Sequence, residues 1–332
     1  MNPSQPIAWP PVSVIMPVLN EERHLAEAVD GVLIQDYPGE LEVVLALGPS
    51  RDRTGDIAAD LATADGRVRL VENPSGRTPD ALNAAIKAAR YDFIVRADGH
   101  GVLSPGYIRV AIDEIRRTGA ANVGGIMRAV GETDFERAVA KAMTSALGIG
   151  GASFHLGGPA GPADTVYLGV FRREVLDRLG GYDEYFARAQ DWELNHRIRA
   201  AGEVVWFTPE LVVTYRPRSS LPALAAQFFR TGQWRREVIR RHPGTVSPRY
   251  LAAPVVTASV GAGVVAGVVS AVGGPRWLAL GWLAPAGYAA GAVVAGVLEG
   301  ADLPPRARVW LPAVLSTMHL SWGAGFLTPL RR

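Results

Sequence analysis

The sequence predicts an α/β protein with a doubly wound, mostly parallel sheet, followed by an apolar helical region. Two observations support this fold class. In the first 215 residues, short apolar and β-branched segments alternate with segments of helical spacing. After residue 249, charge-free stretches appear that are long enough to cross a lipid bilayer as helices.

Four segments have the composition of strands. Residues 12–18 and 41–47 are continuous apolar runs, which are typical of buried parallel strands, and 67–73 and 92–98 follow in order. Segments 21–32, 54–62 and 79–89 lie among them and have helical spacing. Because ligands bind beyond the carboxyl ends of parallel strands, we expect Asn20, the 48–54 loop and Asp98 to share one cleft.

Composition excludes several classes of protein. The 332 residues are 48% hydrophobic, which is enough for one large domain and a smaller appended region. There are no cysteines, so disulfides and thiolate chemistry are absent, and no long charged tail suggests nucleic-acid binding. Residues 1–10 lack the apolar stretch of a signal peptide and are expected to be a disordered lead.

Three charge-free runs follow residue 249, at 250–275, 277–298 and 309–330. The first is rich in Gly, Ala and Val, which suits close helix packing in lipid. The third contains Pro312 and His319, so it is compatible with a re-entrant or interfacial segment. We expect a transmembrane region over 250–332 with two to three spans. Buried helices of a soluble protein remain the alternative.

Residues 219–249 combine an apolar helical face with many arginines. This pattern favours an amphipathic helix in the membrane interface, and a packed soluble helix is the alternative. Six arginines precede the first apolar run, whereas the loop after that run offers only Arg276. This asymmetry predicts a cytoplasmic N-terminal domain. The arginines before the first run are Arg230, Arg235, Arg236, Arg240, Arg241 and Arg249.

The motif Arg96-Ala97-Asp98-Gly99-His100 follows an apolar strand. Two residues apart on an extended strand end, Asp98 and His100 would point the same way. A carboxylate and an imidazole can hold a divalent cation. The alternative is a simple Asp-Gly turn.

A second motif opens a helix at Gln190-Asp191-Trp192-Glu193. Asp191 could cap this helix. Glu193 and Arg197 are four residues apart and could pair, which would leave Asp191 to face elsewhere. The Gly-rich stretch 148–163 is predicted to be a loop rather than a helix or strand, of the kind that often forms a lid or binds substrate. His155 within it is a weak catalytic candidate, and the alternative, which we favour, is that it is merely exposed.

Five segments follow one another along the chain: VSVIMPVLNEERHL, SRDRTGDIA, ALNAAI, ADGH and GGYDEYFARAQDWELNHRIRAAG. Together and in this order, they resemble glycosyltransferase family 2, which has the GT-A fold. The resemblance covers residues 10–240 and rests on five segments. It implies a GT-A catalytic domain over 11–218. The RADGH variant and the membrane region are most similar to members of the succinoglycan-biosynthesis type, which build exopolysaccharide on lipid carriers.

The resemblance implies an inverting transfer of a hexose from a nucleotide diphosphate sugar to a lipid-linked or membrane-proximal glycan acceptor. A UDP-sugar is favoured, and a GDP-sugar is the alternative. Asp98 and His100 would hold Mg²⁺ or Mn²⁺, and Asp191 would be the general base. Membrane lipid is an expected partner and nucleic acid is not. We expect a multi-pass protein of the cell membrane with a cytoplasmic catalytic domain.

The resemblance also implies the binding residues. Donor contacts are expected from Pro17, Val18, Asn20, Glu22, Asp52, Arg77, Asn83 and Asp98. Weaker candidates on the acceptor or product side are Gln190, Trp192, Gln227, Arg230 and Trp234.

The chain departs from the family pattern at several positions. Leu47-Gly48-Pro49 stands where relatives have acidic residues, and Tyr215 stands where many have a histidine ligand. Gln227 and Arg230 match the processive QxxRW pattern imperfectly, which favours single additions. A nucleotidyltransferase or a dehydrogenase would need a glycine-rich phosphate loop after the first strand, and this chain has none there. A non-catalytic nucleotide-binding membrane scaffold remains open.

Overall fold

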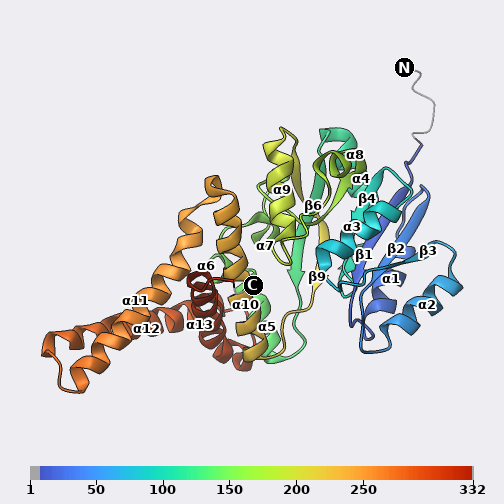
Figure 1. The fold of residues 1–332 in the computed structure, drawn as a ribbon. Helices are drawn as coiled ribbons and strands as arrows, with labels where there is room; N and C mark the ends of the chain where they lie inside the picture. The colour runs from blue at the N-terminus through green and yellow to red at the C-terminus, as the bar shows by residue number, and fades with distance from the viewer. Residues whose placement is uncertain (1–7, 331–332) are drawn as a thin grey trace. The chain divides into compact units, whose positions relative to one another are not determined.

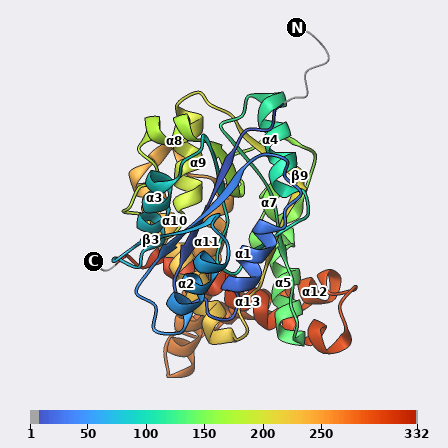
Figure 2. The ribbon, with the colours of Figure 1, turned by 90° about the vertical axis from the view of Figure 1, so that its right-hand side faces the viewer.

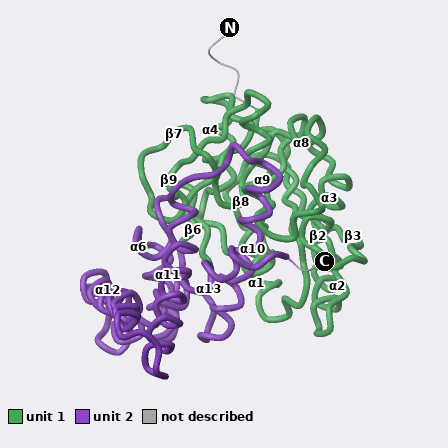
Figure 3. Tube along the Cα trace, turned by 60° about the vertical axis from the view of Figure 1, so that its left-hand side comes forward, with its two compact units in different colours: residues 1–128, 152–215 green, residues 129–151, 216–332 purple. Residues whose placement is uncertain are grey.

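The computed structural model describes residues 8–330, which form two compact units (Figure 3). Unit 1 comprises Met1–Arg128 and Ala152–Tyr215, and unit 2 comprises Ala129–Gly151 and Arg216–Arg332. Residues 129–151 therefore group with the C-terminal region, although the predicted catalytic domain, 11–218, includes them. The predicted disordered lead lies outside the described residues at positions 1–7. Its last residues are held in place, since Arg116 donates to the Ala8 carbonyl at 2.6 Å.

Unit 1 is built on one mixed sheet of nine strands, in the order β3-β2-β1-β4-β8-β6-β9-β5, with β7 paired to β9 (Figure 1). The first four strands in sequence are parallel, as predicted. Pairs β4–β8, β6–β8, β5–β9 and β7–β9 are antiparallel. The strands are β1 (Val12–Val18), β2 (Leu41–Leu47), β3 (Val68–Glu72), β4 (Phe93–Arg96), β5 (Val102–Leu103), β6 (Asn122–Ala129), β7 (Gly161–Pro162), β8 (Tyr167–Arg172) and β9 (Val205–Tyr215).

Helices cover both faces of this sheet, so the doubly wound class is confirmed (Figures 1 and 2). Because side chains alternate along a strand, Val43 and Leu45 belong to the core with α1, α2 and α4. Val44 and Ala46 belong to the core with α3, α8 and α9. The helices of unit 1 are α1 (Leu25–Leu33), α2 (Thr54–Ala64), α3 (Thr78–Ala88), α4 (Tyr107–Thr118), α7 (Ser153–Leu156), α8 (Arg173–Leu179) and α9 (Gln190–Ala200).

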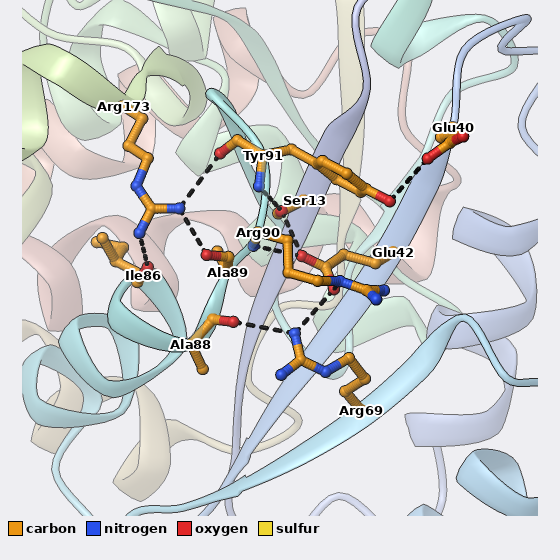
Figure 4. Close-up of polar contacts among 10 residues, drawn as sticks. All are labelled: Ser13, Glu40, Glu42, Arg69, Ile86, Ala88, Ala89, Arg90, Tyr91 and Arg173. Atoms are coloured by element: carbon orange, nitrogen blue, oxygen red, sulfur yellow. Dashed lines mark hydrogen bonds and ion pairs between the residues drawn. The ribbon is translucent and has the colours of Figure 1, made fainter.

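A buried carboxylate, Glu42, ties the amino edge of the parallel strands together (Figure 4). It accepts hydrogen bonds from Ser13 at 2.7 Å, Arg69 at 3.0 Å and the Arg90 side chain at 2.8 Å. Burial alone would raise the pKa of Glu42, but these hydrogen bonds hold it below its usual value. A cavity of about 350 Å³ at the same edge is lined by Arg67, Arg90 and Tyr91, among others. This edge is opposite to the carboxyl ends, where a parallel sheet binds ligands.

Unit 2 is helical, and two of its segments are long and apolar enough to cross a membrane: Pro248–Ala271 and Arg276–Glu299. The third apolar run forms α13, which does not meet that test among the described residues. Instead, Leu311, Leu315 and Met318 of α13 are buried within unit 2. Its elements are α5 (Asp134–Met143), α6 (Ala146–Ile149), α10 (Leu221–Arg241), η1 (Pro243–Thr245), α11 (Pro248–Ala271), η2 (Arg276–Trp282), α12 (Leu283–Glu299) and α13 (Pro305–Leu327).

Helix α10, the predicted interfacial helix, packs closely against α13. A side chain at Gly232 would collide with the Trp322 carbonyl, and one at Gly325 would collide with the Phe229 carbonyl. Leu224 is fully buried on the same helix. The packed-helix alternative therefore describes the inner face of α10, and a lipid contact on its other face stays a prediction.

The prediction for residues 148–163 was wrong in part. This stretch contains the end of α6, one turn of helix α7 and strand β7. Gly150 and Gly157, both at positive φ, end the two short helices, so glycine stops these elements rather than preventing them. His155 is not simply exposed: burial lowers its pKa to about 4.

Candidate active site

The loops after β1 and β2 are joined by hydrogen bonds at the carboxyl edge of the sheet. The Asn20 amide donates to Ser50 at 3.0 Å, and the Arg51 amide donates to the Asn20 side chain at 2.8 Å. The Glu22 amide lies 3.4 Å from an Asp52 carboxylate oxygen. Asn20 has a φ of 57°, which this residue type tolerates better than most. The predicted approach of Asn20 to the 48–54 loop is confirmed.

The chain turns immediately after β4. The strand ends at Arg96, and the Gly101 amide donates to the Asp98 carbonyl at 2.9 Å. The expectation that Asp98 and His100 lie on an extended strand end was therefore wrong, because the chain turns at Asp98 and Gly99. His100 instead pairs through Nδ1 with Glu21 at 2.7 Å.

Arg96 is a site residue that the sequence analysis missed. Its side chain is 3% exposed, and both Nε and Nη2 lie 3.2 Å from Asp98 Oδ1. Its Nη1 donates to Asp191 Oδ1. Burial alone would lower the pKa of Arg96, but Asp191 and Asp98 hold it well above its usual value. The sequence did contain a signal for this position. Side chains alternate along a strand, so Arg96 lies on the same face of β4 as Ile94, which packs toward α9.

Asp191 lies in the first turn of α9 and does not cap it. The N-cap residue is Ala189, at a φ of 61°, and no side chain caps this helix. The capping alternative was wrong because the Asp191 carboxylate is engaged by Arg96. Burial raises the pKa of Asp191 to about 6, against the opposing effect of Arg96. An aspartate with this pKa is suited to accept a proton near neutral pH.

The neighbouring carboxylate, Glu193, has a structural role. It pairs with Arg197 at 2.7 Å, which confirms the predicted pair. Arg197 also donates to the carbonyl oxygens of Leu179 and Gly181, both at 2.8 Å. This arrangement ties α9 to the loop that precedes it, so Glu193 is already occupied while Asp191 faces the end of β4.

Asn83 holds the same loop from the other side. Its side chain accepts from the Tyr182 amide at 2.9 Å and donates to the Tyr182 carbonyl at 2.8 Å. Gly181, with a φ of 69°, allows this approach, because a Cβ there would lie 2.5 Å from Asn83 Oδ1. A donor contact from Asn83 stays a prediction, and the structure assigns its amide to the loop backbone.

The other predicted residues are placed as follows. Pro17 and Val18 are the last residues of β1, and Tyr215 is the last residue of β9. Gln190 and Trp192 lie in the first turn of α9. Arg77 pairs with Asp80 at 3.3 Å. Gln227, Arg230 and Trp234 lie on α10 in unit 2. Within residues 8–330, no group of three or more His, Cys, Asp or Glu side chains is arranged to hold a metal.

The family model described as glycosyl transferase family 2 matches residues 13–180. The chain is also 31% identical over 316 residues to the succinoglycan biosynthesis protein ExoA of Rhizobium meliloti (strain 1021), covering 94% of this chain and 93% of that one. The chain belongs to glycosyltransferase family 2 and is a glycosyltransferase with the GT-A fold.

One further relative and one solved structure are similar to this chain. A Methanococcus voltae protein is 26% identical over 239 residues, covering 69% of this chain and 74% of that one. It is described as a dolichyl N-acetyl-alpha-D-glucosaminyl phosphate 3-beta-D-2,3-diacetamido-2,3-dideoxy-beta-D-glucuronosyltransferase. Among solved structures, the mannosyltransferase PcManGT from Pyrobaculum calidifontis, in complex with GDP-Man and Mn²⁺, has a TM-score of 0.62. It is 23% identical, and the match covers 94% of this chain and 86% of that one, so it supports the fold.

Proposed function

We propose that this glycosyltransferase moves a hexose from a nucleotide diphosphate sugar to a lipid-linked or membrane-proximal glycan acceptor, in cell-envelope or exopolysaccharide synthesis. One observation supports a catalytic role above the others. Asp191, far along the chain from β4, lies against Arg96 at the carboxyl end of that strand and has a pKa of about 6. The likeness to the succinoglycan biosynthesis protein along 94% of the chain supports the polysaccharide role.

The proposed transfer needs one general base, Asp191. The acceptor hydroxyl attacks the anomeric carbon of the donor sugar, and the bond from that carbon to the diphosphate oxygen breaks. The hydroxyl proton passes to Asp191, and the nucleoside diphosphate leaves. One displacement inverts the anomeric configuration, and no covalent enzyme intermediate is needed. The imperfect QxxRW pattern on α10 supports one addition per acceptor.

The donor set at the β4 turn suits a divalent cation. Asp98 offers a carboxylate and His100 an imidazole, and Glu21 orients the imidazole as carboxylates do for metal-ligating histidines. With two protein ligands, other positions are left for diphosphate oxygens and water, which suits Mg²⁺ or Mn²⁺. A bound cation would neutralise charge on the leaving diphosphate. The solved mannosyltransferase is described with Mn²⁺, which supports this proposal.

The donor base is expected to be read weakly. Around Gly48 the neighbours are apolar: a Cβ there would lie 3.0 Å from Leu19 and 3.3 Å from Gly76. No charged side chain stands at positions 47–49 to recognise a uracil ring. We favour a UDP-sugar. A GDP-sugar is the second candidate because the solved relative is described with GDP-Man.

The test is a donor screen on full-length protein in detergent, with UDP- and GDP-sugars, with and without Mn²⁺ or Mg²⁺. Donor hydrolysis or transfer should require the cation and should fall about 10²- to 10⁴-fold in Asp191→Asn. A UDP preference above about a thousandfold, roughly 4 kcal/mol, would contradict weak base reading. Nucleotide binding without turnover of any donor would support a non-catalytic scaffold instead.

We also propose a multi-pass membrane location with a cytoplasmic catalytic domain and membrane lipid as a partner. The two candidate spans expose large apolar side chains, including Val265, Leu283 and Leu298, each at least 64% exposed. Arginines cluster before the first span and return after the second, at Arg306 and Arg308. A two-span hairpin therefore keeps both arginine groups on one side, as the positive-inside rule expects.

A further inference from the structure

At the end of β4, the buried guanidinium of Arg96 lies between the carboxylates of Asp98 and Asp191. From this arrangement we infer that Arg96 is a positioning residue. It holds the side chain of the proposed base, Asp191, in the orientation that catalysis needs, and it links Asp191 to Asp98. The inference rests on the proposed role of Asp191 as the base. Arg96 does not need to touch either substrate in this role.

The main chain holds Arg96 on both sides. It is the last residue of β4, in register with Ile15 of β1 and with Gly169 of β8. With its backbone fixed in the sheet and its side chain 3% exposed, the guanidinium has little freedom. Its planar group of five donors can contact two carboxylates at once, through Nε and Nη2 to Asp98 and through Nη1 to Asp191.

An aromatic ring closes another side of the guanidinium. The Arg96 guanidinium carbon lies 5.8 Å from the centre of the Tyr182 ring, and Tyr182 is buried. The backbone of Tyr182 is the one that Asn83 holds. Thus β4, α3 and the loop before α9 all contribute to the surroundings of one side chain.

Asp191 depends on this support, because Arg96 donates the side-chain hydrogen bond that its carboxylate accepts. Without a cation between them, Asp98 and Asp191 would be like charges in a largely buried site and would repel each other. Removing Arg96 would leave Asp191 free to turn away, and a misplaced catalytic group can cost about 10²-fold in rate.

The matched control is Arg172, the last residue of β8. It also bridges two carboxylates, Glu174 and Glu203, both at 2.6 Å, but β8 runs antiparallel to β4 and its end pairs with Phe93. Arg172 therefore lies at the start of β4 rather than at its end. Arg172→Met removes an ion-pair bridge of the same kind outside the proposed site, from a side chain that is 27% exposed against 3% for Arg96.

The experiment compares full-length wild type, Arg96→Met, Arg96→Lys, Arg172→Met, Asp191→Asn and Arg96→Met/Asp191→Asn in one detergent. We expect Arg96→Met to lower kcat about 10²-fold with an unchanged donor KM. Arg96→Lys should recover part of kcat. The double variant should lose little beyond Asp191→Asn, because residues that act as a unit are not additive. Arg172→Met should keep wild-type kcat.

Two results would overturn the inference while leaving the proposed function intact. One is Arg96→Met with nearly wild-type turnover while Asp191→Asn is inactive. The other is a raised donor KM with unchanged kcat, which would make Arg96 a donor contact. If Arg96→Met fails to fold, Arg96→Lys decides, with a reduced kcat and unchanged KM expected. Asp191→Asn with wild-type turnover would instead remove the proposed base itself.

Discussion

Asp191 owes its chemical character to opposing contributions at the scale of single residues. Burial favours the neutral acid and raises its pKa, and Arg96 favours the carboxylate and lowers it. The balance, at about 6, leaves the group ionised at neutral pH and a stronger base than an ordinary aspartate. Glu193, two residues along, has none of this freedom, because Arg197 already occupies its carboxylate.

This balance predicts the pH dependence of turnover. Only the carboxylate form of Asp191 accepts a proton, so kcat should be level above a pH of about 6 and should fall about tenfold per pH unit below it. The measurement is kcat against pH at saturating donor and metal. Saturating metal matters because acid also protonates histidine ligands.

The control for this profile is Asp191→Asn, which should lack the acidic fall in whatever turnover remains. An unchanged acidic limb in that variant would assign the limb to another group. Loss of turnover on raising the pH through 6 would contradict the role of Asp191 as a base.

At the scale of elements, the four parallel strands and α1 to α3 could be predicted from the sequence. Strands β1 and β2 are buried on both faces, so they are apolar along their length, and periodicity reveals them directly. The end of β4 was predicted two residues too late, since the turn at Asp98 depends on loop contacts that periodicity does not report. The antiparallel strands were not predicted.

The site itself was predictable only in part. Motif order located Asp98 and Asp191 individually. The contact of Arg96 with Asp191 joins residues 95 positions apart, and it forms only when α9 packs on the face of the sheet that carries Arg96. The role of Asn83 was missed for the same reason, because its partner Tyr182 lies 99 positions away.

Asn83 provides a test at this scale. Asn83→Ala removes both hydrogen bonds to the Tyr182 backbone, each worth about 0.5–1.5 kcal/mol. We expect a lower melting temperature, faster proteolysis within 183–189 and a lower kcat with unchanged nucleotide affinity. Thermal unfolding, limited proteolysis and nucleotide titration measure these effects.

The matched control is Arg77→Ala at the N-cap of the same helix. Its ion pair is partly exposed, at 46% for Arg77 and 18% for Asp80, so its effect on stability should stay within about 1 kcal/mol. If Asn83→Ala instead weakened nucleotide binding and left stability unchanged, Asn83 would be a donor contact, as the family resemblance implies.

At the scale of the whole molecule, the membrane arrangement is the main proposal. The native chain has no cysteine, so single cysteines can report topology without background. Val272, between the two candidate spans, is 80% exposed, and Ile34, in unit 1, is 81% exposed. In intact cells, an impermeant maleimide should label Val272→Cys and should not label Ile34→Cys.

After the membrane is permeabilised, both cysteines should react, which controls for their accessibility. Labelling of Ile34→Cys in intact cells would place the catalytic domain outside. If the maleimide labels Val272→Cys only after permeabilisation, the two-span hairpin is contradicted.

The central claim is that Asp191 is the general base of the transfer, and one comparison tests it most directly. Turnover and nucleotide affinity are measured for Asp191→Asn beside Glu193→Gln in the same detergent. Asparagine keeps the volume of aspartate and removes proton acceptance, so turnover should fall by about 10²- to 10⁴-fold while nucleotide affinity stays unchanged. Turnover above about a tenth of wild type in Asp191→Asn, or a larger loss in Glu193→Gln, would contradict the assignment.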